Sequence, residues 1–535
     1  MAQRIKWEAR DLDCDDLCAS TLRSLEANDP DVDGILIEDS NWITRAGPAI
    51  RNSTSLRRLQ IYIPSECGPE YIWLSELLRD LIHNRSIESF GIYFDKPHSH
   101  YQSFPWDIFD MLIPFIVNNS NLQHIELQGG SLSVLSFLAV GLTSCKTKGL
   151  KVIELLDIDI GGDFGTFFAA LTGYHDLSEI LVYDSIIGLE GCIALSKLLQ
   201  HPESHIRSID FQNTPLDDDF ISSICIGLTR NQSVKSINLR GDCNVSSTGW
   251  KIFSDLLSNP MCSIEYLGIN FGFRDSVPKC IEDALSVNKS LKYLNLKGNK
   301  QFTFEGWGNF SGSLRNPCFS LAGLNLSLCN FDDEGVIMLM HAMEGNASLK
   351  HLHLDDNKIS SRGLVAIFNH LRNFESSLKT LHVVDNNINF GELTSEDWSV
   401  LSRALCDKTS IERTFSSNHN LYMIAFFEDD EFEDEWKDVA EWDNIVASLE
   451  MNKQSNRAVV AREKILTHHF AGGTTDMSVF ARMPESILPF AMEWIGRNSF
   501  GYSLMYQFVG GFPWLFGGQN YPTETGEAKK RKYMM

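Results

Sequence analysis

The feature that most limits the fold of this chain is a pattern that recurs about every 28 residues. In the clearest copies, apolar residues stand at a first position, called position 0, and at positions 3 and 5 after it. From the copy that begins at Leu122 to the copy at Leu378 there are nine steps over 256 residues, a mean of 28.4. Such a period indicates stacked structural repeats, since a single unit cannot bury its own apolar side.

Fourteen units of this kind can be followed along the chain. Their first apolar residues are Val32, Leu56, Ile87, Leu122, Leu150, Leu177, Ile206, Val234, Ile264, Leu291, Leu321, Leu349, Leu378 and Ile411. In four consecutive late units, position 8 is occupied by Asn299, Cys329, Asn357 and Asn386. The combined pattern, L-x-x-L-x-L-x-x-N/C, is the core of a leucine-rich repeat.

Each unit has room for a strand, a turn and a full helix. A Gly stands 14 or 15 positions after position 0 in seven units, and apolar residues at helical spacing follow it. An Asn three positions before the next unit predicts the end of the helix, because Asn tolerates the left-handed backbone that ends many helices. These residues are Asn84, Asn119, Asn231, Asn288 and Asn346.

The dimensions of strands and helices predict the shape of the stack. Parallel strands lie about 4.8 Å apart, whereas helices are about 10 Å wide, so the strands should line a concave face and the helices a convex one. The units resemble ribonuclease-inhibitor-like leucine-rich repeats over roughly residues 32–420. The resemblance implies an α/β fold, a right-handed β-α superhelix or horseshoe of about 14 repeats. It specifies the fold more than the function, because one scaffold serves many partners.

Five segments are expected from this pattern. Residues 1–31 form an N-terminal helical cap, 32–420 the repeat solenoid, 421–440 an acidic loop, 441–518 a helical C-terminal cap and 519–535 a basic, disordered tail. Caps are expected because an open solenoid end exposes its core. The C-terminal part also resembles uncharacterised leucine-rich repeat proteins of single-celled algae.

Charge and composition exclude several classes of protein. Asp and Glu number 70 against 46 Lys and Arg, a net charge of −24, which argues against a nucleic-acid binder because phosphate affinity depends on basic side chains. Neither a secretory signal nor a stretch of 18 apolar residues is found, so no membrane partner is expected. We expect a cytoplasmic location, with the nucleus as the alternative because residues 529–532 form a basic cluster.

Sequence motifs of catalysis are absent. The chain contains no G-x-x-x-x-G-K-[ST], H-E-x-x-H, C-x-x-C or G-x-S-x-G pattern. We therefore expect neither enzymatic activity nor a cofactor.

The candidate binding surface is the concave face. Positions 2, 4 and 6 of each strand point away from the core, and equal positions on neighbouring strands form columns. Tyrosine is favoured at interfaces because its rigid, amphipathic ring loses little entropy on binding. The predicted partner-binding residues are Tyr62, Tyr93, Tyr183, Tyr266, Tyr293, His351, His353, Asp355 and His382.

Histidines form a second predicted feature of this face. His351, His353 and His382 should lie within one or two strand spacings of each other, beside Asp355. Contact with a partner is the favoured interpretation. A Zn²⁺ site, or a contact that responds to pH, is the alternative that these side chains allow.

The sequence therefore favours a non-catalytic, monomeric scaffold that binds a protein or peptide on its concave face. Its negative charge favours a basic partner. The alternative is a regulator of a small GTPase, similar to the Ran GTPase-activating proteins, in which an acidic region also follows the horseshoe. The corresponding run here, residues 428–438, has eight acidic residues and one Lys.

Overall fold

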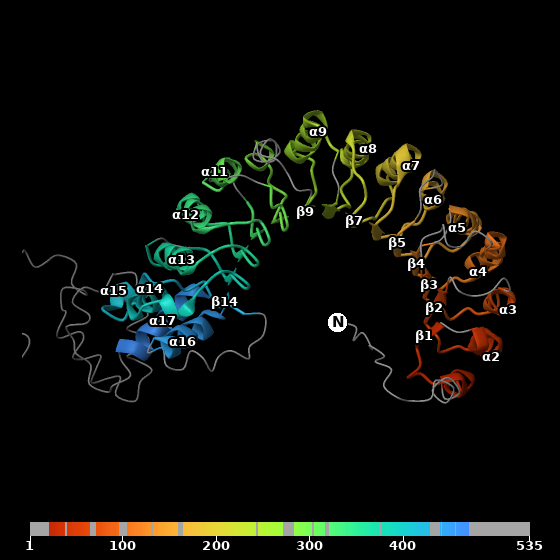
Figure 1. Cartoon of the computed structure of the whole chain (residues 1–535), viewed down its shortest axis with the longest axis horizontal. Helices are drawn as coiled ribbons and strands as arrows, with labels where there is room; N and C mark the ends of the chain where they lie inside the picture. The colour runs from red at the N-terminus through yellow and green to blue at the C-terminus, as the bar shows by residue number, and fades with distance from the viewer. Residues whose placement is uncertain are drawn as a thin grey trace, which may run out of the picture. The chain divides into compact units, whose positions relative to one another are not determined.

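The computed structural model divides the chain into two compact units, Met1–Gly306 and Trp307–Met535 (Figure 1). It describes residues 21–37, 40–64, 71–95, 104–129, 132–158, 164–241, 244–270, 283–301, 304–315, 320–373, 376–427, 439, 441–454 and 456–469. Each unit is built from strands that alternate with helices along the chain.

Within each unit the strands pair in parallel and in sequence order. The strands of the first unit are β1 (Gly34–Ile37), β2 (Arg58–Ile63), β3 (Ser89–Phe94), β4 (His124–Gln128), β5 (Val152–Leu156), β6 (Glu179–Tyr183), β7 (Ser208–Gln212), β8 (Ser236–Arg240), β9 (Tyr266–Asn270) and β10 (Tyr293–Asn295). Those of the second unit are β11 (Gly323–Asn325), β12 (His351–His353), β13 (Thr380–His382) and β14 (Met423–Ala425).

The helices lie on one side of the sheet, and in the first unit the strands line the inner side of an arc (Figure 1). The helices are α2 (Ser40–Asn52), α3 (Ile72–Leu81), η2 (Trp106–Met111), α4 (Leu112–Asn118), α5 (Leu132–Ser144), α6 (Phe164–Ala170), α7 (Gly188–Gln200), α8 (Asp218–Leu228), α9 (Ser247–Ser258), α11 (Phe304–Ser313), α12 (Asp333–Ala342), α13 (Ser361–Asn373), η3 (Phe390–Glu392), α14 (Ser395–Leu405), α15 (Ile411–Phe415), α16 (Trp442–Asn452) and α17 (Arg457–His469). This alternation confirms the predicted α/β repeat solenoid.

Thirteen of the predicted units begin where the structure places a strand, two residues after position 0. The unit predicted at Ile411 is wrong, because that residue opens α15, whose N-terminus is capped by the side chain of Ser410. The strand instead starts at Met423, so Leu421 holds position 0 and β14 lies in the segment predicted as an acidic loop. Asn418, three residues before Leu421, marked the correct register.

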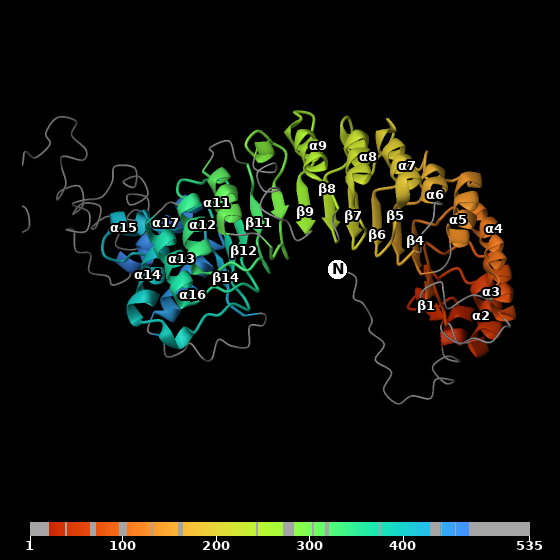
Figure 2. The same cartoon turned by 45° about the horizontal axis from the view of Figure 1, so that its top comes forward.

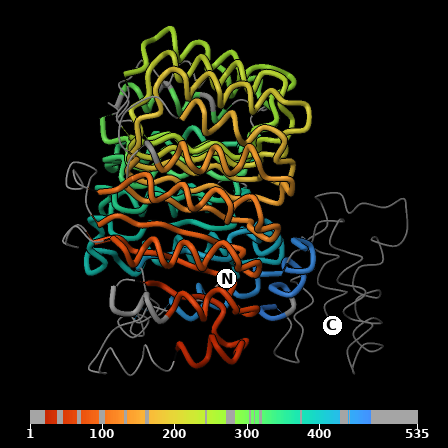
Figure 3. The backbone as a smooth tube through the Cα atoms, turned by 90° about the vertical axis from the view of Figure 1, so that its right-hand side faces the viewer, coloured from red at the N-terminus to blue at the C-terminus, as the bar shows by residue number. Residues whose placement is uncertain are grey.

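The core lies between the sheet and the helices. Leu122, Ile125 and Leu127, at positions 0, 3 and 5 of one unit, are at most 6% exposed, and other units repeat this burial. Burying one such side chain contributes about 1.5–3 kcal/mol. Successive repeats of the first unit lie one above the next in Figure 3, so each apolar layer is covered by its neighbours.

Asparagine side chains tie several repeats to the one before them. The Asn231 amide donates to the Leu199 carbonyl oxygen at 2.8 Å, and its own oxygen accepts from the backbone N–H groups of Ser233 and Val234. Equivalent bonds are made by Asn84, Asn288 and Asn346. These amides satisfy backbone groups that no strand or helix pairs.

The predicted left-handed backbone at these asparagines is wrong. Asn119 has an extended backbone with φ of −94°, and none of the five Asn residues is among the described residues with positive φ. The left-handed position is instead position 7, which directly follows strands β4 to β8 and lies three residues after the end of the shorter strands β10 to β13. It is occupied by Gly129, Asp157, Asp184, Asn213, Gly241, Gly298, Leu328, Asp356 and Asp385. Apart from Leu328, this column holds the residue types that adopt positive φ at least cost.

In several repeats the side chain at position 8 closes the turn after the strand. Asn357 donates to the carbonyl oxygens of Leu326 and Leu354, both at 2.9 Å, and its oxygen accepts from the N–H of Cys329 and of Phe331. In the first unit Asn299 makes similar bonds to the Ile269 and Leu296 carbonyl oxygens, and in two other repeats a hydroxyl group takes this role, as in Ser185, which accepts from the N–H of Ile158 and donates to the Tyr183 carbonyl oxygen.

Helices α16 and α17 cover the end of the second unit. Lys464 on α17 is fully buried, and its ammonium donates to the carbonyl oxygens of Leu405 at 2.6 Å and Asn418 at 3.0 Å. Burial lowers the pKa of this ammonium from its ordinary value to about 7. These two helices lie within residues 441–518, the segment predicted as a helical C-terminal cap.

Several predicted segments lie outside the described residues. They are most of the N-terminal cap (1–20), most of the acidic loop (428–438 and 440), the rest of the C-terminal cap (470–518) and the basic tail (519–535). Within the part of the chain that is described, no helix has the length and apolarity to span a lipid bilayer.

The asparagine links generate the first prediction. Asn231→Ala leaves one carbonyl oxygen and two N–H groups without their partner, so we expect the free energy of unfolding to fall by at least about 2 kcal/mol. Urea titration measures this loss, and amide hydrogen exchange at Val234 locates it. The control is Asn259→Ala, because the Asn259 amide donates only a longer bond of 3.5 Å to the Thr229 carbonyl oxygen and its oxygen accepts from one N–H, that of Met261, instead of two. Equal losses of unfolding free energy in the two variants would contradict the stabilising role assigned to the Asn231 side chain.

Lys464 generates a prediction about pH. Its pKa is about 7 in the folded chain and 10.5 when unfolded, so the unfolded state binds more protons between these values. Stability should therefore rise with pH across this window, by about 2 kcal/mol from pH 7 to pH 9 for this group. In Lys464→Met this contribution disappears. The measurement is the difference in unfolding free energy between the two proteins at several pH values, and a constant difference would refute the prediction.

Candidate functional site

The candidate site is the open face of the sheet, meaning the side of the strands that the helices do not cover (Figure 2). Along β4, the buried residues Ile125 and Leu127 alternate with the half-buried His124, Glu126 and Gln128. This alternation follows from the two-residue period of a strand. The parallel register then brings equal positions of neighbouring repeats side by side.

The structure places the five predicted tyrosines on this face and brings four of them into two pairs. Tyr62 on β2 is in register with Tyr93 on β3, and Tyr266 on β9 with Tyr293 on β10. Tyr293 is 43% exposed. Tyr183 on β6 lies apart from the pairs, between residues of β5 and β7.

The rings of Tyr93 and Tyr266 are held in place before any partner binds. The Tyr93 ring lies against Gly91, where an added Cβ would come within 2.8 Å of the ring carbon Cε2. Its hydroxyl accepts from the Gln60 amide at 2.6 Å. The hydroxyl of Tyr266 likewise accepts from the Asn295 amide at 3.0 Å. Fixed aromatic rings lose less entropy on binding than mobile ones.

Carboxylates between the tyrosine pairs were missed by the sequence reasoning. Glu126 on β4 and Glu154 on β5 are in register, and the Nε2 atom of His124 lies 3.8 Å from an oxygen of Glu154. Further along, Asp210 on β7 accepts from the amides of Asn238 and Gln212 at 3.0 and 3.1 Å. All three carboxylates occupy position 4 of their repeats, so reading that column along the whole chain would have found them.

This part of the face is acidic enough to change the ionisation of its side chains. Burial, followed by the charges of Asp210 and Glu154, raises the pKa of Tyr183 to about 12. Burial, together with a hydrogen bond to Glu126, raises the pKa of Tyr93 as well. Burial also raises the pKa of Asp210, although its amide partners oppose the shift. We call Glu126, Glu154 and Asp210 the carboxylate row.

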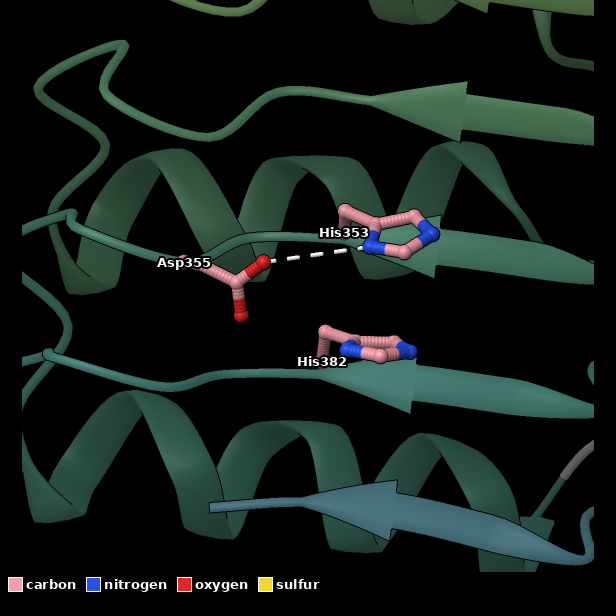
Figure 4. Close-up of side chains that lie close together, drawn as sticks. All are labelled: His353, Asp355 and His382. Atoms are coloured by element: carbon pink, nitrogen blue, oxygen red, sulfur yellow. Dashed lines mark ion pairs between the residues drawn. The ribbon is translucent and has the colours of Figure 1, made fainter. Parts of the chain in front are cut away.

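The predicted histidine cluster lies on β12 and β13 of the second unit. His353 and His382 are in register, and their rings stack with centroids 4.1 Å apart and an interplanar angle of 23°. Asp355 lies beside them, with 3.8 Å between its Oδ2 and the Nδ1 of His353 (Figure 4). His351 is turned to another partner, because its Nδ1 lies 3.0 Å from the hydroxyl oxygen of Thr380.

Burial and neighbouring groups shift the ionisation of this cluster. Burial, followed by the charge of His353, lowers the pKa of both His351 and His382. Burial alone would raise the pKa of Asp355, but the neighbouring His353 and the N–H of Val384 hold it below its ordinary value.

Two groups of described residues place three potential ligand atoms within 4.8 Å of one another. One comprises His353, Asp355 and His382, and the other His124, Glu126 and Glu154. The first offers two imidazoles and one carboxylate, a donor set typical of zinc. The second offers two carboxylates and one imidazole.

Comparison with known proteins agrees with the repeat architecture. The family model described as "Leucine Rich repeat" matches residues 318–340 and 345–368, which span the strand and helix of two consecutive repeats. This match and the relatives described next support a leucine-rich repeat family for the chain. The family supports a protein-interaction role.

Relatives of this leucine-rich repeat protein share only part of their length with it. It is 28% identical over 255 residues to "NACHT, LRR and PYD domains-containing protein 13" of Homo sapiens, a match that covers 46% of this chain and 24% of that protein. It is 26% identical over 317 residues to "NACHT, LRR and PYD domains-containing protein 14" of Mus musculus, a match that covers 58% of this chain and 30% of that protein. The chain thus spans about a quarter to a third of these relatives' length.

Among solved structures, "Leiomodin-1 Actin-Binding Site 2 (ABS2)" is 17% identical and covers 33% of this chain and 89% of its own. Its TM-score of 0.24 is too low to bear on the fold. The alternative role as a GTPase regulator depends on residues 428–438, which lie outside the described residues.

Proposed function

We propose that this leucine-rich repeat protein is a non-catalytic scaffold that binds a protein or peptide on its open face, and that the partner presents basic side chains to the first unit. The carboxylate row, with Tyr93 on the strand before it and Tyr183 on the strand between Glu154 and Asp210, is the observation that carries the proposal. In the second unit, residues of the predicted set, among them His351, lie on the open side of that unit's own strands.

The register of Glu126 and Glu154 favours a cationic partner group. Carboxylates that face each other on adjacent strands repel, because their Cα atoms lie about 4.8 Å apart. A guanidinium or ammonium placed between them relieves this repulsion, and a guanidinium can bind both oxygens of a carboxylate at once.

The adjacent tyrosines favour the same partner chemistry. The ring of Tyr93 lies beside Glu126, with which its hydroxyl forms a hydrogen bond, and Tyr183 lies within the field of Glu154 and Asp210. Arginine stacks well on aromatic faces while it pairs with a carboxylate. The net charge of −24 speeds the approach of a basic partner at low salt.

The test is affinity capture from cell extract followed by mass spectrometry, comparing the natural chain with the double variant Glu126→Gln and Glu154→Gln. We expect basic proteins captured by the natural chain to fall at least tenfold in the variant. Capture by the natural chain should also weaken as salt is raised, because the interaction is between charges.

The matched control removes two acidic charges from the helix side, by Glu190→Gln on α7 and Asp255→Asn on α9, both of which are exposed. This control has the same net charge as the face variant and should retain capture. Equal loss in both variants would mean that overall charge, not the open face, determines binding. Undiminished capture by the face variant would refute the carboxylate row as the contact.

A further inference from the structure

The histidine cluster of the second unit has features that a protein contact does not require. His353 and His382 occupy the same position on adjacent strands, so the backbone register fixes the separation of their Cα atoms. Figure 4 shows that each ring turns one nitrogen toward the side on which the Asp355 carboxylate lies. Two nitrogen donors and one oxygen donor therefore lie close together on one side of the two rings.

The position of Asp355 is fixed by bonds that leave it able to bind a cation. Its Oδ1 accepts from the N–H of Val384 at 3.0 Å, and its Oδ2 accepts from the hydroxyl of Ser327 at 3.3 Å. A carboxylate oxygen has more than one lone pair, so both oxygens can accept a further ligand. Hydrogen bonds of this kind orient a metal-binding carboxylate.

The three donor atoms lie close enough that a small movement of their side chains gives the spacing of tetrahedral coordination. The three atoms lie within 4.8 Å of one another, whereas nitrogen ligands about 2.05 Å from zinc stand about 3.3 Å apart. The three side chains are half-buried, so rotation of the rings out of their stack can close the difference without moving the strands.

We propose that His353, His382 and Asp355 form a binding site for Zn²⁺ on the open face of the second unit. Two imidazoles and a carboxylate match the ligand set of zinc sites that keep a fourth position open. That position faces away from the core and can take water or a side chain of a partner. This site is independent of the carboxylate row, which lies in the first unit.

The test is isothermal titration of the metal-free full chain with Zn²⁺, with a parallel titration with Co²⁺ followed by visible absorption. We expect one zinc equivalent that depends on this cluster, and a Co²⁺ spectrum typical of tetrahedral coordination. His382→Phe retains an aromatic ring against His353 but removes the nitrogen donor, so it should weaken this binding at least tenfold. Asp355→Asn should weaken it as well, and circular dichroism verifies that both variants fold.

The matched control is His351→Ala, on the same strand and half-buried like His353, with its Nδ1 beside Thr380. It should bind zinc as the natural chain does. The proposal is overturned if the natural chain binds no zinc, if His382→Phe binds it undiminished, or if His351→Ala loses as much affinity as His382→Phe. Loss of the zinc equivalent in His124→Ala would also overturn it, by placing the ion at the other three-ligand group.

Discussion

In several repeats, a hydrogen bond from an asparagine amide to a carbonyl oxygen of the preceding repeat holds the stack on which the open face is built. Each strand contributes only three to six residues to the sheet, so apolar packing alone leaves the backbone between helix and strand with unpaired polar groups. The amide of Asn84 or Asn288 satisfies three or more of them at once. Because one of these groups belongs to the previous repeat, the bond also fixes how far successive repeats are rotated against each other.

The sequence predicts the strands well because every strand is marked by several apolar residues at fixed positions of the repeat. Positions 0, 3 and 5 are buried in unit after unit, and that burial leaves little freedom for other residue types. The wrong prediction at Ile411 has the same origin. Ile411 is an apolar residue at roughly the expected interval, so a strand was predicted there, but it opens a helix whose N-terminus is capped by Ser410. The left-handed backbone was assigned to the wrong column, because Asn is also suited to the side-chain bonds it makes here. The Asp, Asn and Gly residues at position 7 carried the correct signal.

The candidate site was harder to predict, because it depends on which way side chains turn. The columns of tyrosine and histidine follow from the repeat register alone. The stacking of His353 on His382, and the turn of His351 toward Thr380, depend on side-chain rotation and on neighbours from adjacent strands. The sequence grouped all three histidines, whereas the structure associates two of them with Asp355. The open face thus carries carboxylates and phenols in one unit and imidazoles in the other.

The distance between neighbouring strands also determines which residues of a bound peptide can reach side chains on different strands. Tyr93 on β3 and Tyr183 on β6 are three strand steps apart, about 14 Å at about 4.8 Å per step. An extended peptide advances about 6.8 Å between side chains on the same side, so two such intervals cover nearly the same length. A peptide that crosses the first unit at right angles to its strands therefore meets the two rings with residues i and i+4. Its residue i+2 then stands above the strands that carry Glu126 and Glu154.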